Sequence, residues 1–365
     1  MKKTLILSIL PILAIICSCT QDKGEVKEPT FTQTEQESLS QMNMFAIDAL
    51  ANAMSMGNGR SLVLSPLSLA VSLGMEANLQ PVNASDILEL LCQDNMDQVN
   101  ALMNKVINKY NYPVSGIEKT LATGIFNDGT LDESSSQIKT YYLSDIYSCD
   151  FSKPLEVSSK VVDWVKSRTK GMIDLESIAI PEGTQRIHTS AVYFNGQWSK
   201  KFDENLTYDT DFHMANEEVK TVKMMSTSYE GLYSETANAK MAVMPYSGKK
   251  YQMVFIQTVD NQPLTYQMWS TLNSSLDNRQ ISLFVPRFEI EFKEEMDFGL
   301  KACNMLHCAK IIVNERGTQA SASTITGDVS AGPLEPVEFI ADRPFYFAIV
   351  DCDTDLIVFA GHFNG

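Results

Sequence analysis

Apolar residues recur at two spacings along this chain, and each spacing predicts a different kind of element. Early in the chain they return every three or four residues, which is typical of one face of an α-helix. Later they form short β-branched and aromatic runs between turn residues, which is typical of strands. The predicted helices are 39–53, 66–77, 85–91, 96–109 and 158–170. The predicted strands are 187–194, 219–225, 240–246, 251–258, 281–286, 288–292, 309–313, 345–351 and 356–361.

Helices that come mostly early and strands that come mostly late predict an α+β fold. The helix that follows Ser65 is expected in the interior of that fold. Ser65 is a favoured N-cap residue, and Pro66 suits the first helical position. The residues from there to Ala77 are apolar on nearly every side, which is the pattern of a buried helix.

The first residues predict a bacterial lipoprotein signal peptide, residues 1–18. Two lysines precede an apolar run that is too short to span a bilayer as a stable helix. Small Ser18 stands before Cys19, whereas bulky Ile16 stands before Cys17, so Cys19 is the expected lipid-bearing residue. A plain secretory signal with a nearby cysteine is the alternative interpretation.

Residues 19–38 are polar, contain Pro29 and show no apolar period, so they are expected to form a flexible tether. A lipid on Cys19 would anchor the protein to a membrane of the cell envelope. The outer membrane of a Gram-negative bacterium is the expected location.

The charge and the cysteines exclude several classes of function. The net charge is −16 and the pI is about 4.7, which repels a phosphate backbone, so nucleic acid is not an expected partner. The remaining cysteines form no CxxC motif, so neither a disulfide framework nor a zinc site is expected. Cys303 and Cys308 are near enough in sequence to pair, and the sequence leaves this question open.

The sequence offers no catalytic constellation. It has four histidines, and no Gly-x-Ser-x-Gly elbow accompanies them, so an envelope esterase is a poor interpretation. Metal-ligand spacings and phosphate-binding glycine loops do not stand out either. The protein is therefore not expected to be an enzyme, or to hold a metal or a cofactor.

The segment 314–333 is long, and its residues are mostly small and hydroxylated. A structureless loop of this length in a compact domain is usually functional or disordered. Small side chains that suit a buried sheet face occupy every second position from Thr318: Thr318, Ala320, Ala322, Thr324 and Thr326. This loop is therefore expected to be able to become a strand.

The same segment resembles the hinge and reactive loop of the serpins. Further segments resemble other serpin motifs in the same order: 65–70, 189–198, 339–349 and 358–361. The resemblance implies one serpin domain over residues 39–365. In that fold, helices pack around a large central mixed β-sheet with smaller sheets, and an exposed reactive loop is expected at about 315–337.

The resemblance also implies an activity. A serpin of this kind is a suicide-substrate inhibitor of serine endopeptidases, and cysteine endopeptidases are a further class of target. The partner is held in a covalent acyl complex, and the inhibitor is expected to be a monomer. The resemblance identifies these hinge residues, which apart from the first are small: Glu315, Gly317, Thr318, Ala320, Ala322 and Thr324. A non-inhibitory binding or carrier protein of the same fold is the alternative, and the small hinge favours inhibition.

The family's spacing places the scissile bond after Ala331 when counted forward, and nearer Pro333 when counted back. The candidate residues are Val329, Ser330, Ala331 and Gly332. No Lys, Arg or aromatic residue occurs in 318–338, so elastase-like or subtilisin-like proteases are the expected targets. Asp328 leaves a minor route to an Asp-specific protease.

Finally, the resemblance implies a cluster that controls opening of the main sheet. Its expected members are Ser65, Ser68, Ser190 and His307. The chain also departs from the family over residues 76–83, where the glycine-containing turn that usually follows the central helix is replaced.

Overall fold

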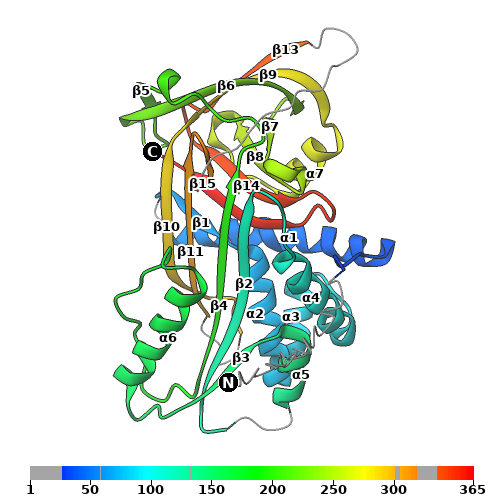
Figure 1. Ribbon diagram of the computed structural model, residues 1–365, viewed down its shortest axis with the longest axis vertical. Helices are drawn as coiled ribbons and strands as arrows, with labels where there is room; N and C mark the ends of the chain where they lie inside the picture. The colour runs from blue at the N-terminus through cyan, green and yellow to red at the C-terminus, as the bar shows by residue number, and fades with distance from the viewer. Residues whose placement is uncertain (1–26, 58, 131–133, 301–304, 319–334) are drawn as a thin grey trace, which may run out of the picture.

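A computed structural model describes residues 27–57, 59–130, 134–300, 305–318 and 335–365, and Figure 1 shows its arrangement. The helices are α1 (Gln33–Met56), α2 (Pro66–Leu79), α3 (Ala84–Leu90), α4 (Met96–Asn111), α5 (Ser134–Tyr142), α6 (Pro154–Arg168) and α7 (Tyr266–Ser274). All the predicted helices are present. The short helices α5 and α7 were not predicted.

The strands occupy most of the second half of the chain. They are β1 (Leu62–Leu64), β2 (Ile117–Asp128), β3 (Asp145–Cys149), β4 (Arg186–Gln197), β5 (Tyr208–His213), β6 (Val219–Glu235), β7 (Ala239–Pro245), β8 (Tyr251–Thr258), β9 (Asp277–Pro286), β10 (Phe288–Met296), β11 (Met305–Asn314), β12 (Gly317–Thr318), β13 (Pro336–Ile340), β14 (Phe345–Asp351) and β15 (Ile357–Phe363). Every predicted strand is among them, and the α+β fold is confirmed.

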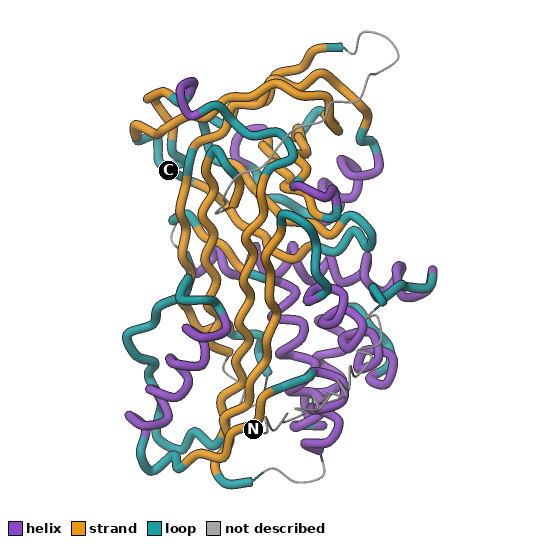
Figure 2. The backbone as a smooth tube through the Cα atoms, in the orientation of Figure 1, coloured by secondary structure: helices purple, strands orange, loops and turns teal. Residues whose placement is uncertain are grey.

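The central sheet has six strands in the order β10-β11-β12-β4-β2-β3. Most neighbours are antiparallel and β2 is parallel to β3, so the sheet is mixed. Its long strands run vertically in Figure 2. Helix α2 covers one face, where Ser72 bonds Ser190 of β4, and α6 packs on the other face through Trp164. Side chains of β4 therefore alternate between two buried environments.

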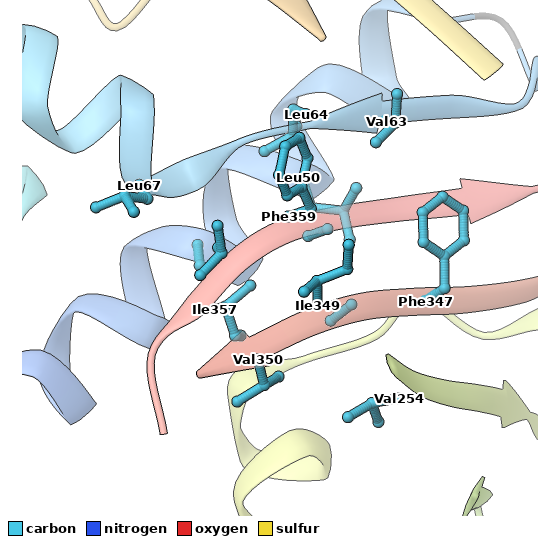
Figure 3. Close-up of a cluster of buried hydrophobic side chains, with 14 of the residues drawn as sticks. Leu50, Val63, Leu64, Leu67, Val254, Phe347, Ile349, Val350, Ile357 and Phe359 are labelled. Carbon is cyan, nitrogen blue, oxygen red and sulfur yellow. The ribbon is translucent and has the colours of Figure 1, made fainter. Parts of the chain in front are cut away.

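The remaining strands form a nine-stranded set that starts at β1 and ends at β13, with β5 paired to β6. Its core lies where β14 and β15 meet β1 and α1. Figure 3 shows Phe359 of β15 next to Leu50 of α1 and Leu64 of β1, with Ile349 and Phe347 of β14 in the same cluster of side chains. All five side chains are buried, so this region forms a rigid support for one end of the central sheet.

The boundary of the predicted tether needs a correction. The chain becomes helical at Gln33, not after residue 38. Thr32 and Glu35 form a capping box, with the Thr32 amide donating to Glu35 Oε2 at 2.8 Å, and this fixes the start of α1. Glu28 also pairs with Lys109 of α4. The tether can therefore extend only to the residues before these contacts.

The described ends of the predicted reactive loop are strands. Gly317 and Thr318 form β12, and Pro336 begins β13, which pairs in parallel with β9. Among the helices of the described ranges, none combines the length and the apolar character that a membrane crossing requires.

Candidate functional site: hinge and sheet-opening cluster

Glu315 anchors the start of the hinge. Its side chain is buried, and Oε1 accepts a hydrogen bond from the Thr207 hydroxyl at 2.7 Å and pairs with the Arg287 guanidinium. Burial alone would raise its pKa, but the hydrogen bonds from Arg287 and Thr207 outweigh burial and hold the pKa below its usual value. The carboxylate is therefore ionised and fixes the point where the chain leaves β11.

Gly317 is the position where the chain turns back into the sheet. Its φ is 149°, and a Cβ atom there would lie 2.1 Å from the carbonyl oxygen of Gly196. Only glycine allows this close approach between two backbones. The resemblance predicted a hinge glycine at this position, and the geometry gives the physical reason for it.

Thr318 already lies inside the central sheet. The two residues of β12 pair with Val313 and Asn314 of β11 on one side, and with Gly196 and Gln197 of β4 on the other. The Thr318 hydroxyl lies 2.7 Å from the hydroxyl of Tyr246, and its side chain is 1% exposed. The hinge is thus partly inserted in the resting structure.

Two aromatic side chains that the sequence did not single out as hinge supports hold this end of the sheet. The Trp198 and Tyr246 rings stack, with centroids 4.6 Å apart. The Trp198 indole donates from Nε1 to the carbonyl of Asn314 at 2.8 Å. The upper end of β11 therefore cannot move away from β4 without breaking this bond.

Below β12, the strands β4 and β11 lie side by side, and no backbone ladder joins them within the described residues. We call this region the gap. A cavity of about 830 Å³ lies at its lower end, bordered by Arg186 and His188 of β4, Leu306 of β11 and Glu76 of α2. Facing strand edges without a ladder can accept a further strand.

The residues predicted for the sheet-opening cluster do come together. The Ser65 amide donates to Nε2 of His307 at 3.0 Å, and the Ser65 hydroxyl donates to the carbonyl of Val358 at 2.8 Å. The Ser68 amide donates to the Ser65 hydroxyl at 3.2 Å, and Ser190 donates to the carbonyl of Ser68 at 3.4 Å. The cluster thus ties α2 to β4, β11 and β15.

His307 must be neutral to play this part, because Nε2 accepts from an amide. Burial lowers its pKa to about 3, and its side chain is 2% exposed. The ring therefore stays unprotonated at neutral pH. Ser72 is a further member that the sequence did not indicate: its hydroxyl donates to Ser190 at 3.2 Å. Ser72 lies among apolar residues of α2, so the sequence pattern does not indicate this role.

Several predicted residues lie outside the described residues. They are Ala320, Ala322 and Thr324 of the hinge, the scissile candidates Val329, Ser330, Ala331 and Gly332, and the lipidation residue Cys19. Cys303 also lies outside, so its pairing with Cys308 stays open. Across the described ranges, no three His, Cys, Asp or Glu side chains converge in an arrangement that could hold a metal ion.

Known proteins similar to this chain share this architecture. The chain is 26% identical to antitrypsin of Bombyx mori, covering 84% of this chain and 93% of that protein. It is 28% identical to human serpin B3, covering 74% and 80%. The native crystal structure of the thermophilic serpin tengpin superposes with a TM-score of 0.80 at 24% identity, covering 93% of this chain and 96% of that one.

A crystal structure of human thyroxine-binding globulin with thyroxine also has a TM-score of 0.80, at 21% identity, covering 90% and 98%. At this identity the likeness concerns the fold. Residues 40–305 and 296–365 match the description of the serpins as serine protease inhibitors. Together these matches span nearly all of the domain that contains the hinge, the gap and the sheet-opening cluster, and the chain belongs to the serpin family.

Proposed function

We propose that this protein is a suicide-substrate inhibitor of serine endopeptidases, with cysteine endopeptidases as a further class of target. The serine hydroxyl of the protease adds to the scissile carbonyl of the reactive loop. Its proton passes to the departing amine, and the peptide C–N bond breaks. The loop is then bound to the protease as an acyl ester. Insertion of the freed loop into the gap carries the protease away before water can hydrolyse that ester.

The partly inserted hinge is the observation that carries this proposal. Thr318 is paired on both sides, and the gap below it continues in the same direction between two strand edges. A strand that extends β12 would complete a ladder with each neighbour. The resulting gain in backbone hydrogen bonds supplies a driving force for insertion.

A non-inhibitory carrier protein is the second candidate function. The fold of thyroxine-binding globulin, which by its name binds thyroxine, matches this chain with a TM-score of 0.80. A carrier would not need a loop that can enter the sheet. The inward positions of the loop carry only small side chains down to Thr326, which favours inhibition over transport.

Incubation with a panel of purified proteases separates the two functions. We expect an adduct that survives a denaturing gel with elastase-like or subtilisin-like enzymes, because residues 318–338 contain no Lys, Arg or aromatic residue and the scissile candidates Val329, Ser330, Ala331 and Gly332 are small. Simple cleavage without an adduct for every protease would indicate a carrier. Rapid, stoichiometric adducts with trypsin but not with elastase would overturn the specificity alone.

We also propose that the mature chain is lipid-anchored through Cys19 in the envelope of a Gram-negative bacterium. The lipobox-like run and the polar residues after it support this location. Glu28 stands nine positions after Cys19 and already pairs with Lys109 of α4. The inhibitor would therefore act close to the membrane surface.

A further inference from the structure

The cavity at the lower end of the gap is bounded on one side by residues 175–185, which belong to the segment that joins α6 to β4. This wall is held by hydrogen bonds. The Ile178 amide donates to the Ser158 hydroxyl at 3.0 Å, and that hydroxyl donates to the Ile178 carbonyl at 3.1 Å. The carbonyl of Gln185 accepts from the amide of Asp128 at 2.8 Å. The wall is therefore preformed, as is usual for small-molecule sites.

Half-buried apolar side chains line much of the cavity. They come from the joining segment and from the lower ends of β4 and β11, and they pack against a buried core cluster around Trp164: Ile178, Ile180, Ile187 and Leu306. A bound apolar molecule would remove more of their surface from water. The volume of about 830 Å³ lies in the range of pockets that hold drug-sized ligands.

A buried polar pair borders the same cavity. Glu76, near the end of α2, places Oε2 at 3.0 Å from Nε2 of His188 on β4. Asn83 donates from Nδ2 to the other carboxylate oxygen at 3.0 Å. The side chains of Glu76 and His188 are 3% and 7% exposed. In the neutral ring the proton therefore lies on Nε2, and Nδ1 is left as an acceptor.

Nδ1 of His188 is an acceptor without a partner. It is buried, and no hydrogen bond reaches it from the described residues. Such an unpartnered buried polar atom costs about 1–3 kcal/mol. The ring borders the cavity, so a donor held there could pair with Nδ1 if the ring tilts while Nε2 keeps its contact with Glu76. A ligand that brings such a donor would recover part of the cost.

The charges around the cavity disfavour an anionic ligand. Among the described residues that border it, five are glutamates and two are basic, Arg186 and Lys293. Lys293 is already engaged, because its Nζ donates to the carbonyl of Asp174 at 3.1 Å and lies 3.0 Å from Glu291. A carboxylate ligand would meet both this acidic lining and the lone pair of Nδ1.

Arg186 favours a hydroxyl over an ammonium group. It stands two positions before His188 on β4, so the two side chains lie on the same face of the strand. Its Nε donates to Oδ1 of Asn127 at 2.9 Å, and no carboxylate pairs with its guanidinium within the described ranges. An ammonium group beside His188 would be close to this positive charge. A hydroxyl group can donate to Nδ1 and accept from the guanidinium.

We propose that this cavity binds a neutral apolar small molecule with one terminal hydroxyl group, a phenol or an alcohol, whose hydroxyl donates to Nδ1 of His188. The apolar body of the ligand would lie against the isoleucines and Leu306. The site is built from described residues of α2, β4, β11 and the joining segment. It requires no insertion of the reactive loop, so it goes beyond the proposed inhibitory function.

The test titrates the full chain, by calorimetry, with four probes of similar size: biphenyl, 4-phenylphenol, biphenyl-4-carboxylic acid and 4-phenylbenzylamine. His188→Gln is the informative variant, because its amide nitrogen can still donate to Glu76 while the acceptor at the Nδ1 position is lost. Ala179→Trp adds an indole ring at a position that borders the cavity. Ala237→Trp, at an exposed position elsewhere, is the matched control.

We expect 4-phenylphenol to bind at one site about fivefold more tightly than biphenyl, the equivalent of one hydrogen bond of about 1 kcal/mol. His188→Gln should remove this advantage and leave the affinity for biphenyl unchanged. Ala179→Trp should weaken the binding of both probes about tenfold or more, and Ala237→Trp should weaken neither. The ¹⁵N NMR signal of His188 Nδ1 should move when 4-phenylphenol is added and not when biphenyl is added.

Several results would overturn the proposal. Absence of saturable binding of 4-phenylphenol would show that the cavity is no site for this class of ligand. Equal affinity of 4-phenylphenol for wild type and His188→Gln would exclude Nδ1 as its partner. Tighter binding of the acid or the amine would refute the hydroxyl class, and undiminished binding to Ala179→Trp would place the probe elsewhere. The proposed inhibitory function would survive each of these results, because adduct formation with proteases tests it separately.

Discussion

The neutral His307 makes the closed central sheet sensitive to acid. Burial lowers its pKa from 6.5 to about 3, so the folded protein releases a proton that the unfolded chain binds below pH 6.5. Folding stability is therefore complete above pH 6.5 and is lost as the pH falls from there towards 3. At pH 5 the expected loss from this residue is about 2 kcal/mol.

The hydrogen bond between Ser65 and His307 gives a second reason, besides desolvation, why acid destabilises the closed sheet. Protonation would turn Nε2 of His307 into a donor that faces the donating amide of Ser65. The hydrogen bond that ties α2 to β11 would then be lost, and two donors would face each other. Opening the sheet to water removes this conflict, so acid favours the open form.

The assay is urea unfolding at pH 7.5 and pH 5, followed by tryptophan fluorescence. The informative variant is His307→Gln, whose amide oxygen can still accept from Ser65 but does not titrate in this range. Wild type should lose about 2 kcal/mol more unfolding free energy than His307→Gln between the two pH values. His213→Gln, at an exposed position, should behave like wild type.

The comparison between variants also separates His307 from other groups. His362 is buried with a pKa lowered to about 4, and it adds an acid loss of the same sign. That contribution is common to wild type and His307→Gln, so it cancels in the difference. Equal pH dependence in the two proteins would refute the reasoning from the buried, neutral His307.

The remaining predictions concern the hinge and the anchor. Thr318→Arg would place a charged side chain at a site that is 1% exposed, which costs several kcal/mol. The measured stoichiometry of inhibition should therefore rise, and an unchanged stoichiometry would contradict this prediction. Gly317→Ala should lower the melting temperature of the resting form, because its Cβ atom would clash with the carbonyl oxygen of Gly196 at a cost of about 1–3 kcal/mol. An unaltered melting curve would argue against the β12 geometry. Cys19→Ala should abolish incorporation of labelled fatty acid in a bacterial host, and persistent label would disprove the anchor.

Much of the fold was predictable because its elements repeat regular patterns. Helix α2 shows this, since Ser65, Pro66 and a run that is apolar on nearly every side predict both its start and its burial. Helix α7 is only nine residues long and has few buried positions, so its period is too weak to predict. Strand β12 has two residues, and only its neighbours define it as a strand.

The site residues that lie in serpin-like motifs were predictable from the sequence. Contacts between side chains from distant parts of the chain were not. The hinge and His307 were found by their resemblance to serpin motifs. Tyr246 lies far from Thr318 in the sequence, and the bond between their hydroxyls follows from the placement of strands. The start of α1 was missed because a capping box works on polar residues, which a search for apolar periodicity ignores.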